Sequence, residues 1–261
     1  MEKISKAQVK MVRSLQQKKF RDERGLFVAE GEKCVSELSK NFELVSLIVE
    51  DGLTSHSASG LTSHSNAVAP LLATRTEIEQ MSGLRTPQGV IAVFRKRPLN
   101  PPIFADLSLS LALDGIQDPG NLGTIIRTCD WFGVHQIVCS PDTADCYNPK
   151  VVQATMGALA RVQIHYTDLP QWLSQQSCAI YGTLLDGRDM YKELSIINCQ
   201  LSTIIVMGNE GNGISPEVRR LITHPIRIPS YPADAETSES LNVSIATAIV
   251  LAEFRRQALF S

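Results

Sequence analysis

The sequence has few features of a metal-binding, disulfide-bonded or membrane protein. Its six cysteines, at positions 34, 129, 139, 146, 178 and 199 of 261 residues, include no C-x-x-C pair, so neither a cysteine metal site nor a disulfide framework is expected. Apolar runs are short pieces such as residues 91–94 and 204–207, far below the ~20 residues of a membrane-spanning helix. The polar, basic N-terminal segment lacks the apolar stretch of a secretory signal. We therefore expect a cytoplasmic protein without membrane association and with reduced cysteines.

The signatures of several common enzyme sites are also absent. The sequence contains no G-x-x-x-x-G-K-S/T phosphate loop, no H-E-x-x-H zinc motif and no G-x-S-x-G nucleophile elbow. Gly208, Gly211 and Gly213 occur as G-x-x-G-x-G, which is not the dinucleotide-binding order. His56 and His64 lie in a repeated GLTSHS segment with no third ligand type nearby. We expect the repeat, at 52–57 and 60–65, to be a surface loop, with no metal site and neither NAD nor ATP as cofactor.

Positive charge is concentrated in two segments, although the whole chain has a formal net charge of −2. Residues 1–24 contain eight Lys or Arg and three acidic residues, a local excess of five positive charges. Residues 80–105 contain no acidic residue and four basic ones, at 85, 95, 96 and 97. Two interpretations stay open: a solvated helix face, or a binding surface for a polyanion, since phosphate binding depends on where the cations lie.

A proline-rich segment divides the chain into two parts of different pattern. Pro98, Pro101 and Pro102 disfavour helix and sheet, and we assign the linker to residues 98–107. In the first part, 1–97, we expect helices at 5–18 and 31–40 and strands at 44–49 and 89–94. A further short helix is expected to begin at a capping box of Thr76 and Glu79. The first part is therefore predicted to be a small α+β domain.

Strands and helices alternate in the second part, residues 108–261. We expect strands at 109–113, 136–139, 162–165, 179–184, 203–207 and 225–228, and helices at 121–132, 149–159, 170–176, 215–223 and 240–259. This alternation predicts an α/β domain in which helices cover both faces of a parallel sheet. Because ligands bind such sheets at the carboxyl ends of the strands, the polar loops at 114–127, 206–213 and 226–244 are the candidate site.

These loops carry a resemblance to a known enzyme family. The segments DPGNLGTIIRT (118–128), VMGNEGNGIS (206–215), and IP (228–229) with SLNVSIATA (240–248) resemble the motifs of the SpoU/TrmH branch of the SPOUT RNA methyltransferases. Members transfer a methyl group from S-adenosylmethionine to a ribose 2′-hydroxyl. The segments GLFVAEGEKCVSEL (25–38) and TPQGVIAVF (86–94) resemble the RNA substrate-binding domain of the ribosomal-RNA members, which is similar to a ribosomal protein that holds RNA kinks.

The resemblance implies an architecture and a set of site residues. It implies that residues 108–261 form a methyltransferase domain with a C-terminal trefoil knot, and that the protein is a homodimer with active sites near the interface. The implied S-adenosylmethionine pocket contains Met207, Gly208, Asn209, Ile228 and Leu241. The implied catalytic neighbourhood contains Asn121, Arg127, Glu210, Ser240 and Asn242. In this sequence the stretch between Pro229 and Ser240 is ten residues long and has no glycine, whereas family members have a shorter stretch with one.

The implied chemistry is consistent with these residue types. The methyl carbon of a sulfonium is already activated, so the enzyme must align the 2′-oxygen with the C–S bond and help to remove the hydroxyl proton. No metal is required. A guanidinium stays protonated in proteins, and Arg127 is therefore expected to hold the adjacent phosphate and the ribose oxygen. Whether it also accepts the proton stays open.

Three functions are compatible with the sequence. We expect a ribosomal-RNA 2′-O-methyltransferase, because the N-terminal segments resemble the ribosomal-RNA members. The same chemistry on transfer RNA is the nearest alternative. The third is a non-catalytic RNA-binding or ribosome-assembly protein that keeps the fold, and the presence of Arg127, Glu210 and Asn242 argues against it.

Overall fold

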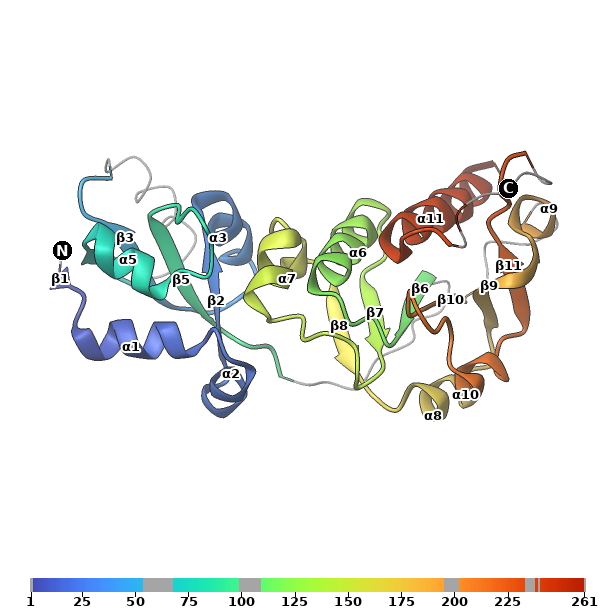
Figure 1. Cartoon of the computed structure of the whole chain (residues 1–261), viewed down its shortest axis with the longest axis horizontal. Coiled ribbons are helices and arrows are strands. Elements are labelled where there is room, and N and C mark those ends of the chain that lie inside the picture. Colours follow the sequence, from blue (N-terminus) through green and yellow to red (C-terminus); the bar gives the residue numbers. More distant parts are fainter. Residues whose placement is uncertain are drawn as a thin grey trace. The chain divides into compact units, whose positions relative to one another are not determined.

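The chain folds into two compact units, as the computed structural model in Figure 1 shows. Unit 1 consists of residues 1–98 and 145–161, and unit 2 of residues 99–144 and 162–261. The structure describes residues 2–53, 68–98, 109–194, 202–232, 238 and 240–260. Most of the repeated segment at 52–65, the linker and the centre of the 230–239 stretch lie outside these residues. Within the described residues, no helix combines the length and the apolar character needed to cross a membrane.

Unit 1 is built on a mixed five-stranded sheet in the order β1-β4-β3-β5-β2. The strands are β1 (Glu2–Lys3), β2 (Leu26–Glu30), β3 (Leu44–Glu50), β4 (Leu71–Ala73) and β5 (Val90–Arg95). β5 is antiparallel to both β2 and β3, whereas β4 is parallel to β1 and β3. The helices are α1 (Lys6–Ser14), α2 (Lys18–Arg24), α3 (Glu32–Leu38), α5 (Arg75–Met81) and α7 (Pro149–Ala154) with the 3-10 turn η1 (Ala158–Ala160). The predicted α+β pattern agrees with these elements.

Two helix starts in unit 1 differ from the prediction. The helix expected at 5–18 ends at Ser14, and α2 starts separately at Lys18 after Gln17 adopts an extended conformation. The predicted capping box of Thr76 and Glu79 is wrong. Thr74 is the N-cap of α5, and its backbone N–H donates to the Glu77 carboxylate at 2.8 Å. Both pairs have the capping-box spacing, but β4 ends at Ala73, so Thr74 is the first residue free to cap the helix.

Residues 145–161, which connect β7 to β8 of unit 2, complete the core of unit 1. The Tyr147 ring lies 4.7 Å from the fully buried ring of Phe27, centroid to centroid. Arg21 is 1% exposed and binds the Asp145 carboxylate at 2.6 Å. It also donates to the carbonyl oxygens of Leu15 and Gln16. The sequence pattern predicts a single domain over all of 108–261, whereas this segment packs with residues 1–98.

Unit 2 contains a six-stranded sheet that is parallel throughout, in the order β11-β9-β10-β6-β7-β8. Its strands are β6 (Leu109–Asp114), β7 (Gln136–Cys139), β8 (Gln163–Tyr166), β9 (Ala179–Asp189), β10 (Thr203–Gly208) and β11 (His224–Arg227). Its helices are α6 (Pro119–Trp131), α8 (Leu169–Ser174), α9 (Met190–Glu193), α10 (Pro216–Arg219) and α11 (Val243–Phe260). The predicted α/β class with a parallel sheet is confirmed.

Helices cover both faces of this sheet, with α6 and α11 on one side and α8 and α10 on the other (Figure 1). Because side chains alternate along a strand, Val206 packs in the cluster beneath α8 and α10. Tyr181 of β9 instead meets Phe254 of α11, with the ring centroids 5.0 Å apart. The helix expected at 149–159 is divided, since Gly157 has a φ of 92°, and the helix expected at 215–223 is a single turn.

Candidate active site

Two of the polar loops begin side by side at the carboxyl edge of the sheet. β6 and β10 are adjacent parallel strands whose last residues, Asp114 and Gly208, are partners in register. The loop after β6 leads into α6, and the loop after β10 leads to α10. The third segment follows β11 and leads into α11, which packs against α6. The fold therefore brings the three motif segments to one edge of unit 2.

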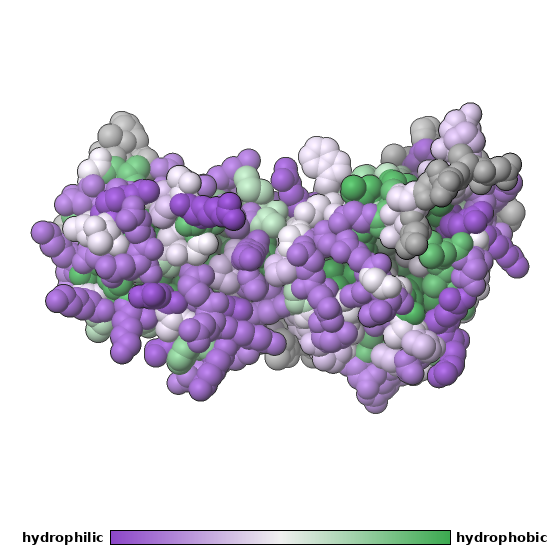
Figure 2. All heavy atoms as spheres, in the orientation of Figure 1, coloured by the Kyte–Doolittle hydropathy of each residue, from purple (hydrophilic) through white to green (hydrophobic). Residues whose placement is uncertain are grey.

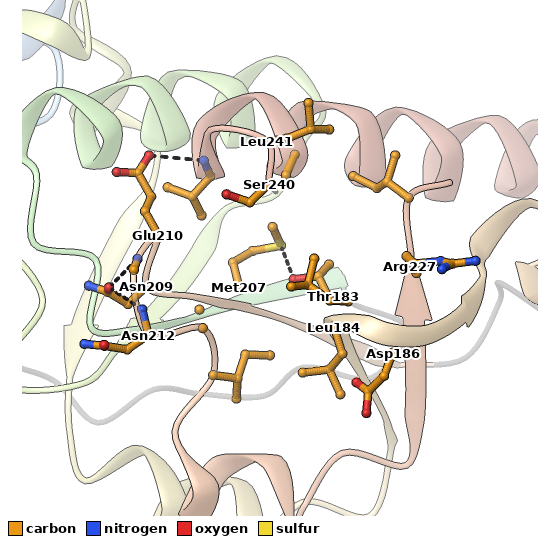
Figure 3. A pocket seen from close by; sticks show the side chains of 18 of the residues that line it. Thr183, Leu184, Asp186, Met207, Asn209, Glu210, Asn212, Arg227, Ser240 and Leu241 are labelled. Carbon is orange, nitrogen blue, oxygen red and sulfur yellow. Dashed lines mark hydrogen bonds between the residues drawn. The ribbon is translucent and has the colours of Figure 1, made fainter. Parts of the chain in front are cut away.

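A cavity of about 870 Å³ opens between these segments. At one end Figure 3 shows Asn209, Glu210 and Asn212, and at the other end Asp186 and Arg227. Less polar side chains lie between the two ends; they are Thr183, Leu184 and Met207, with Ser240 and Leu241 in the segment just before α11 (Figure 3). Three further residues of the predicted motif segments also line the cavity: Gly208, Ile228 and Pro229. This mixed lining suits a ligand with both apolar and polar parts.

The wall of the cavity at Gly208 consists of closely packed backbone. A Cβ atom on Gly208 would lie 2.4 Å from both the carbonyl carbon of Gly213 and the nitrogen of Ile214. The loop is closed by two 2.9 Å hydrogen bonds between the backbones of Asn209 and Gly213. Only glycine fits at position 208 without displacing this backbone.

The Asn209 side chain uses its polar atoms to hold the loops together. Its Nδ2 donates to the carbonyl oxygen of Gly115 at 2.6 Å, and its Oδ1 accepts from the N–H groups of Gly211 and Asn212 at 2.8 and 3.1 Å. Next to it, the mostly buried Asp114 carboxylate accepts from the N–H of Ser215 at 2.7 Å. Both side chains thus connect the loop after β6 to the loop after β10.

Three of the predicted catalytic residues form one hydrogen-bonded cluster. Glu210 Oε1 accepts from Asn121 Nδ2 at 2.8 Å and from Asn242 Nδ2 at 2.7 Å. Asn242 Nδ2 also lies 3.0 Å from Asn121 Oδ1, and the N–H of Val243 reaches Glu210 at 3.3 Å. Asn242 Oδ1 caps α11 by accepting from the N–H groups of Ser244 and Ile245, so α11 begins at Val243 and not at the predicted Ser240. The side chains of the three motifs therefore have fixed mutual positions.

The other two predicted catalytic residues stand outside this cluster. Ser240 is exposed and lines the cavity. Arg127 is exposed on α6, six residues after Asn121, and makes no ion pair with any residue that the structure describes. Arg127 does not line the cavity.

The sequence motifs did not indicate the part of the lining that comes from β9. This strand continues to Asp189, five residues beyond the predicted end, and its Thr183, Leu184 and Asp186 line the cavity. Asp186 forms an ion pair with Arg219 at 2.5 Å, which holds the Asp186 pKa below its usual value. The mixed polarity of residues 185–189 gave no strand signal. Among the described residues, no group of three His, Cys, Asp or Glu side chains could hold a metal ion.

Comparisons with known proteins agree with this geometry. Residues 108–252 match the model of the SpoU rRNA Methylase family, and residues 6–92 match the MRM3-like substrate binding domain. An uncharacterized tRNA/rRNA methyltransferase of Synechocystis is 36% identical over 69% of this chain and 65% of its own length. The 23S rRNA (guanosine(2553)-2′-O)-methyltransferase RlmP of Bacillus subtilis is 28% identical over 97% of this chain and 98% of its own length.

Two solved structures are similar over nearly the whole chain. A putative RNA methyltransferase of the TrmH family from Porphyromonas gingivalis has a TM-score of 0.86 and 37% identity, covering 97% of this chain and 99% of its own. The AdoMet-bound rRNA methyltransferase of Sinorhizobium meliloti has a TM-score of 0.82 and 31% identity, covering 98% of this chain and 97% of its own. Because the family model spans more than half of the sequence and includes all three motif segments, this chain belongs to the SpoU rRNA methylase family.

Proposed function

We propose that this protein transfers a methyl group from S-adenosylmethionine to a ribose 2′-hydroxyl of ribosomal RNA. The observation that carries the proposal is the Glu210 cluster, which joins the three family motifs and whose Glu210 lines the cavity. The relative from Bacillus subtilis is a 23S rRNA 2′-O-methyltransferase, and the match at residues 6–92 is to a substrate-binding domain. Tritiated S-adenosylmethionine should label unmodified ribosomal RNA, whereas preferential labelling of transfer RNA would favour the alternative substrate.

The cavity fits S-adenosylmethionine, which the similar structure from Sinorhizobium meliloti contains. Backbone groups at Gly208 and Ile228 and the side chains of Met207 and Leu241 would hold it. Asn209 would act mainly by positioning the loop, because its polar atoms are engaged by backbone. When bound, S-adenosylmethionine supplies a methyl carbon activated by the sulfonium. The protein must then align the ribose 2′-oxygen with the methyl carbon and help to remove the proton of the 2′-hydroxyl.

The catalytic roles follow from charge and position. Glu210 would orient the amide groups of Asn121 and Asn242, because both amide nitrogens donate to the same carboxylate oxygen. Arg127 would hold the phosphate beside the target ribose through its planar fork of donors. Ser240, exposed at the rim of the cavity, would contact the ribose or the cofactor. These residues would lower the barrier by positioning, which needs no metal.

The proposal includes a trefoil knot in the C-terminal segment and a functional division into a substrate-binding domain (1–97), a linker (98–107) and a methyltransferase domain (108–261), of which residues 145–161 pack with unit 1. It also includes a homodimer. Three large apolar side chains are exposed on or beside the packed helices α6 and α11: Trp131 is 84% exposed, Ile245 54% and Leu241 47%. Large apolar side chains exposed on neighbouring packed helices favour an interface there.

Light scattering tests the dimer. We expect a mass of about 57 kDa at micromolar concentration, twice the 28.7 kDa of one chain, because an obligate interface of ~2,000 Å² or more gives tight association. Trp131→Lys should lower the dimer fraction, whereas Tyr191→Lys, at an exposed aromatic on α9, should not. A wild-type mass near 28.7 kDa would remove the dimer from the proposal.

A further inference from the structure

We propose that the exposed face of α1 and α2 in unit 1 binds the phosphate backbone of the RNA substrate. This basic face consists of Lys6, Lys10, Arg13, Lys18, Lys19 and Arg24, all of them exposed. The inference rests on the proposed function, since it takes the substrate to be RNA. It assigns a surface and a mode of contact to unit 1 that the cavity in unit 2 does not provide.

The first observation is how the cations of unit 1 divide into paired and unpaired groups. Elsewhere on the unit five cations are in ion pairs: Lys40 with Glu37, Arg75 with Glu50 and Glu79, Arg95 with Glu43, Lys96 with Asp22, and Arg161 with Glu37. Exposed cations without an ion pair among the described residues also occur singly there, at positions 33, 85 and 150. Among the described residues, no member of the basic face makes an ion pair. An unpaired cation has its full charge available to a phosphate, whereas a paired one must first give up its carboxylate.

The second observation is that α1 presents its cations on a single side. Lys6, Lys10 and Arg13 follow each other at spacings of four and three, which places them on one face of a helix. Val9 and Val12 are buried on another side. A complete capping box at Ser5 fixes the start of α1, so this row of charges is part of a well-defined helix.

The third observation is that α2 is held rigidly beside the end of α1. Arg21, the buried basic residue of α2, donates to the carbonyl oxygens of Leu15 and Gln16 and to Asp145. The remaining basic residues of α2, at 18, 19 and 24, stay exposed. Of the acidic residues of α2, Asp22 is neutralised by Lys96 at 2.6 Å, and only Glu23 stands unpaired among the described residues. The exposed cations of α2 are therefore carried by a helix of defined position, and the face keeps a net positive charge.

The chemistry of this face indicates backbone contact and not base reading. Figure 2 shows mainly hydrophilic side chains over the part of unit 1 that contains α1 and α2. Lys and Arg neutralise phosphates and release counterions, which fixes the position of an RNA without reading its sequence. Base recognition in RNA commonly uses aromatic rings on which unstacked bases lie. The basic face has no aromatic member, and most of its cations are Lys, which acts on a phosphate as a point charge. The face would therefore position the RNA while other parts of the protein select the nucleotide.

The test compares two full-length variants that each lose three positive charges. The first is Lys6→Gln/Lys10→Gln/Arg13→Gln on the basic face. The control is Lys40→Gln/Arg75→Gln/Arg95→Gln, whose ion pairs are exposed and contribute little to stability. Binding to an in vitro transcript of 23S ribosomal RNA is measured between 50 and 300 mM salt, roughly the range in which phosphate contacts change affinity strongly. A second triple, Lys18→Gln/Lys19→Gln/Arg24→Gln, tests α2 separately.

We expect both basic-face variants to lower the slope of log K against log salt by about 2, because each neutralised phosphate contributes ~0.7–0.9 to that slope, and the control to lower it by less than about 1. Circular dichroism should be unchanged, because glutamine is a good helix former. Equal slopes for the basic-face and control variants would overturn the inference, because the basic face would then make no more phosphate contacts than the paired cations do. Methyl transfer by the wild-type protein is measured in parallel. Its absence would reject the proposed function, whereas the slopes alone decide the inference.

Discussion

Arg127→Lys and Arg127→Ala are both expected to lose methyl transfer to RNA by at least ~100-fold, the lower range for a positioned catalytic group. An ammonium carries the same charge as a guanidinium, but it lacks the planar pair of donors that binds a phosphate and a neighbouring oxygen together. Cofactor affinity should be unchanged, since Arg127 does not line the cavity. Arg127 is also exposed and free of ion pairs within the described part of the chain, so its loss should not unfold α6.

Two measurements on the same variants check this result. Isothermal titration with S-adenosylhomocysteine reports the cofactor site, and a methyl-transfer assay reports the reaction. Arg255→Ala provides a control for loss of an arginine in unit 2, because Arg255 binds the carbonyl oxygens of Phe132 and Gly133 and does not line the cavity. Full activity in a correctly folded Arg127→Ala protein would show that the catalytic role assigned to Arg127 is wrong.

Gly208→Ala is expected to weaken S-adenosylhomocysteine binding by about 10- to 100-fold. The new methyl group would lie 2.4 Å from backbone atoms of Gly213 and Ile214, and backbone cannot turn aside as a side chain can. Overpacking of this kind costs about 1–3 kcal/mol, and about 1.4 kcal/mol corresponds to tenfold in affinity. The cost should appear in binding, because the displaced loop forms the wall of the cavity.

Gly211→Ala is the matched control in the same loop. Its Cβ would lie 3.5 Å from Asn209 Oδ1, an ordinary van der Waals contact. We expect its affinity for S-adenosylhomocysteine to stay within about twofold of the wild type, since a change of about 0.4 kcal/mol is small on the scale of surface substitutions. Equal affinities for Gly208→Ala and Gly211→Ala would show that the cofactor does not bind against this loop.

Local patterns predicted most of the elements, and they failed where an element depends on a distant partner. The alternation of unit 2 is visible in short apolar runs such as 204–207, which are typical of buried strands. The packing of residues 145–161 with unit 1 has no local signal, because Tyr147 and Val151 are ordinary core residues until Phe27 and β2 are placed beside them. Arg21 looks in the sequence like one more surface cation, yet it is buried because three acceptors surround it.

The candidate site, too, was predicted only in part, because some of its contacts depend on distant parts of the chain. The motif segments predicted that Asn121, Glu210 and Asn242 belong to one site, and the three side chains are hydrogen-bonded to one another. The individual function of Asn209 could not be predicted, since its amide contacts depend on the neighbouring loop at Gly115. Asp114 was missed for a similar reason: only the register of β6 against β10 brings its carboxylate to Ser215. The family resemblance of the motif segments indicated the residues of the site, and the fold determines which of them lie together.

The most direct measurement of the proposed activity is mass spectrometry of nucleosides from ribosomal RNA incubated with the protein and S-adenosylmethionine carrying a deuterated methyl group. We expect the label on a ribose 2′-oxygen of one nucleotide, and we expect Arg127→Ala to abolish it while S-adenosylhomocysteine still binds. Label on a base, or no label above the level of a reaction without protein, would refute the proposed activity.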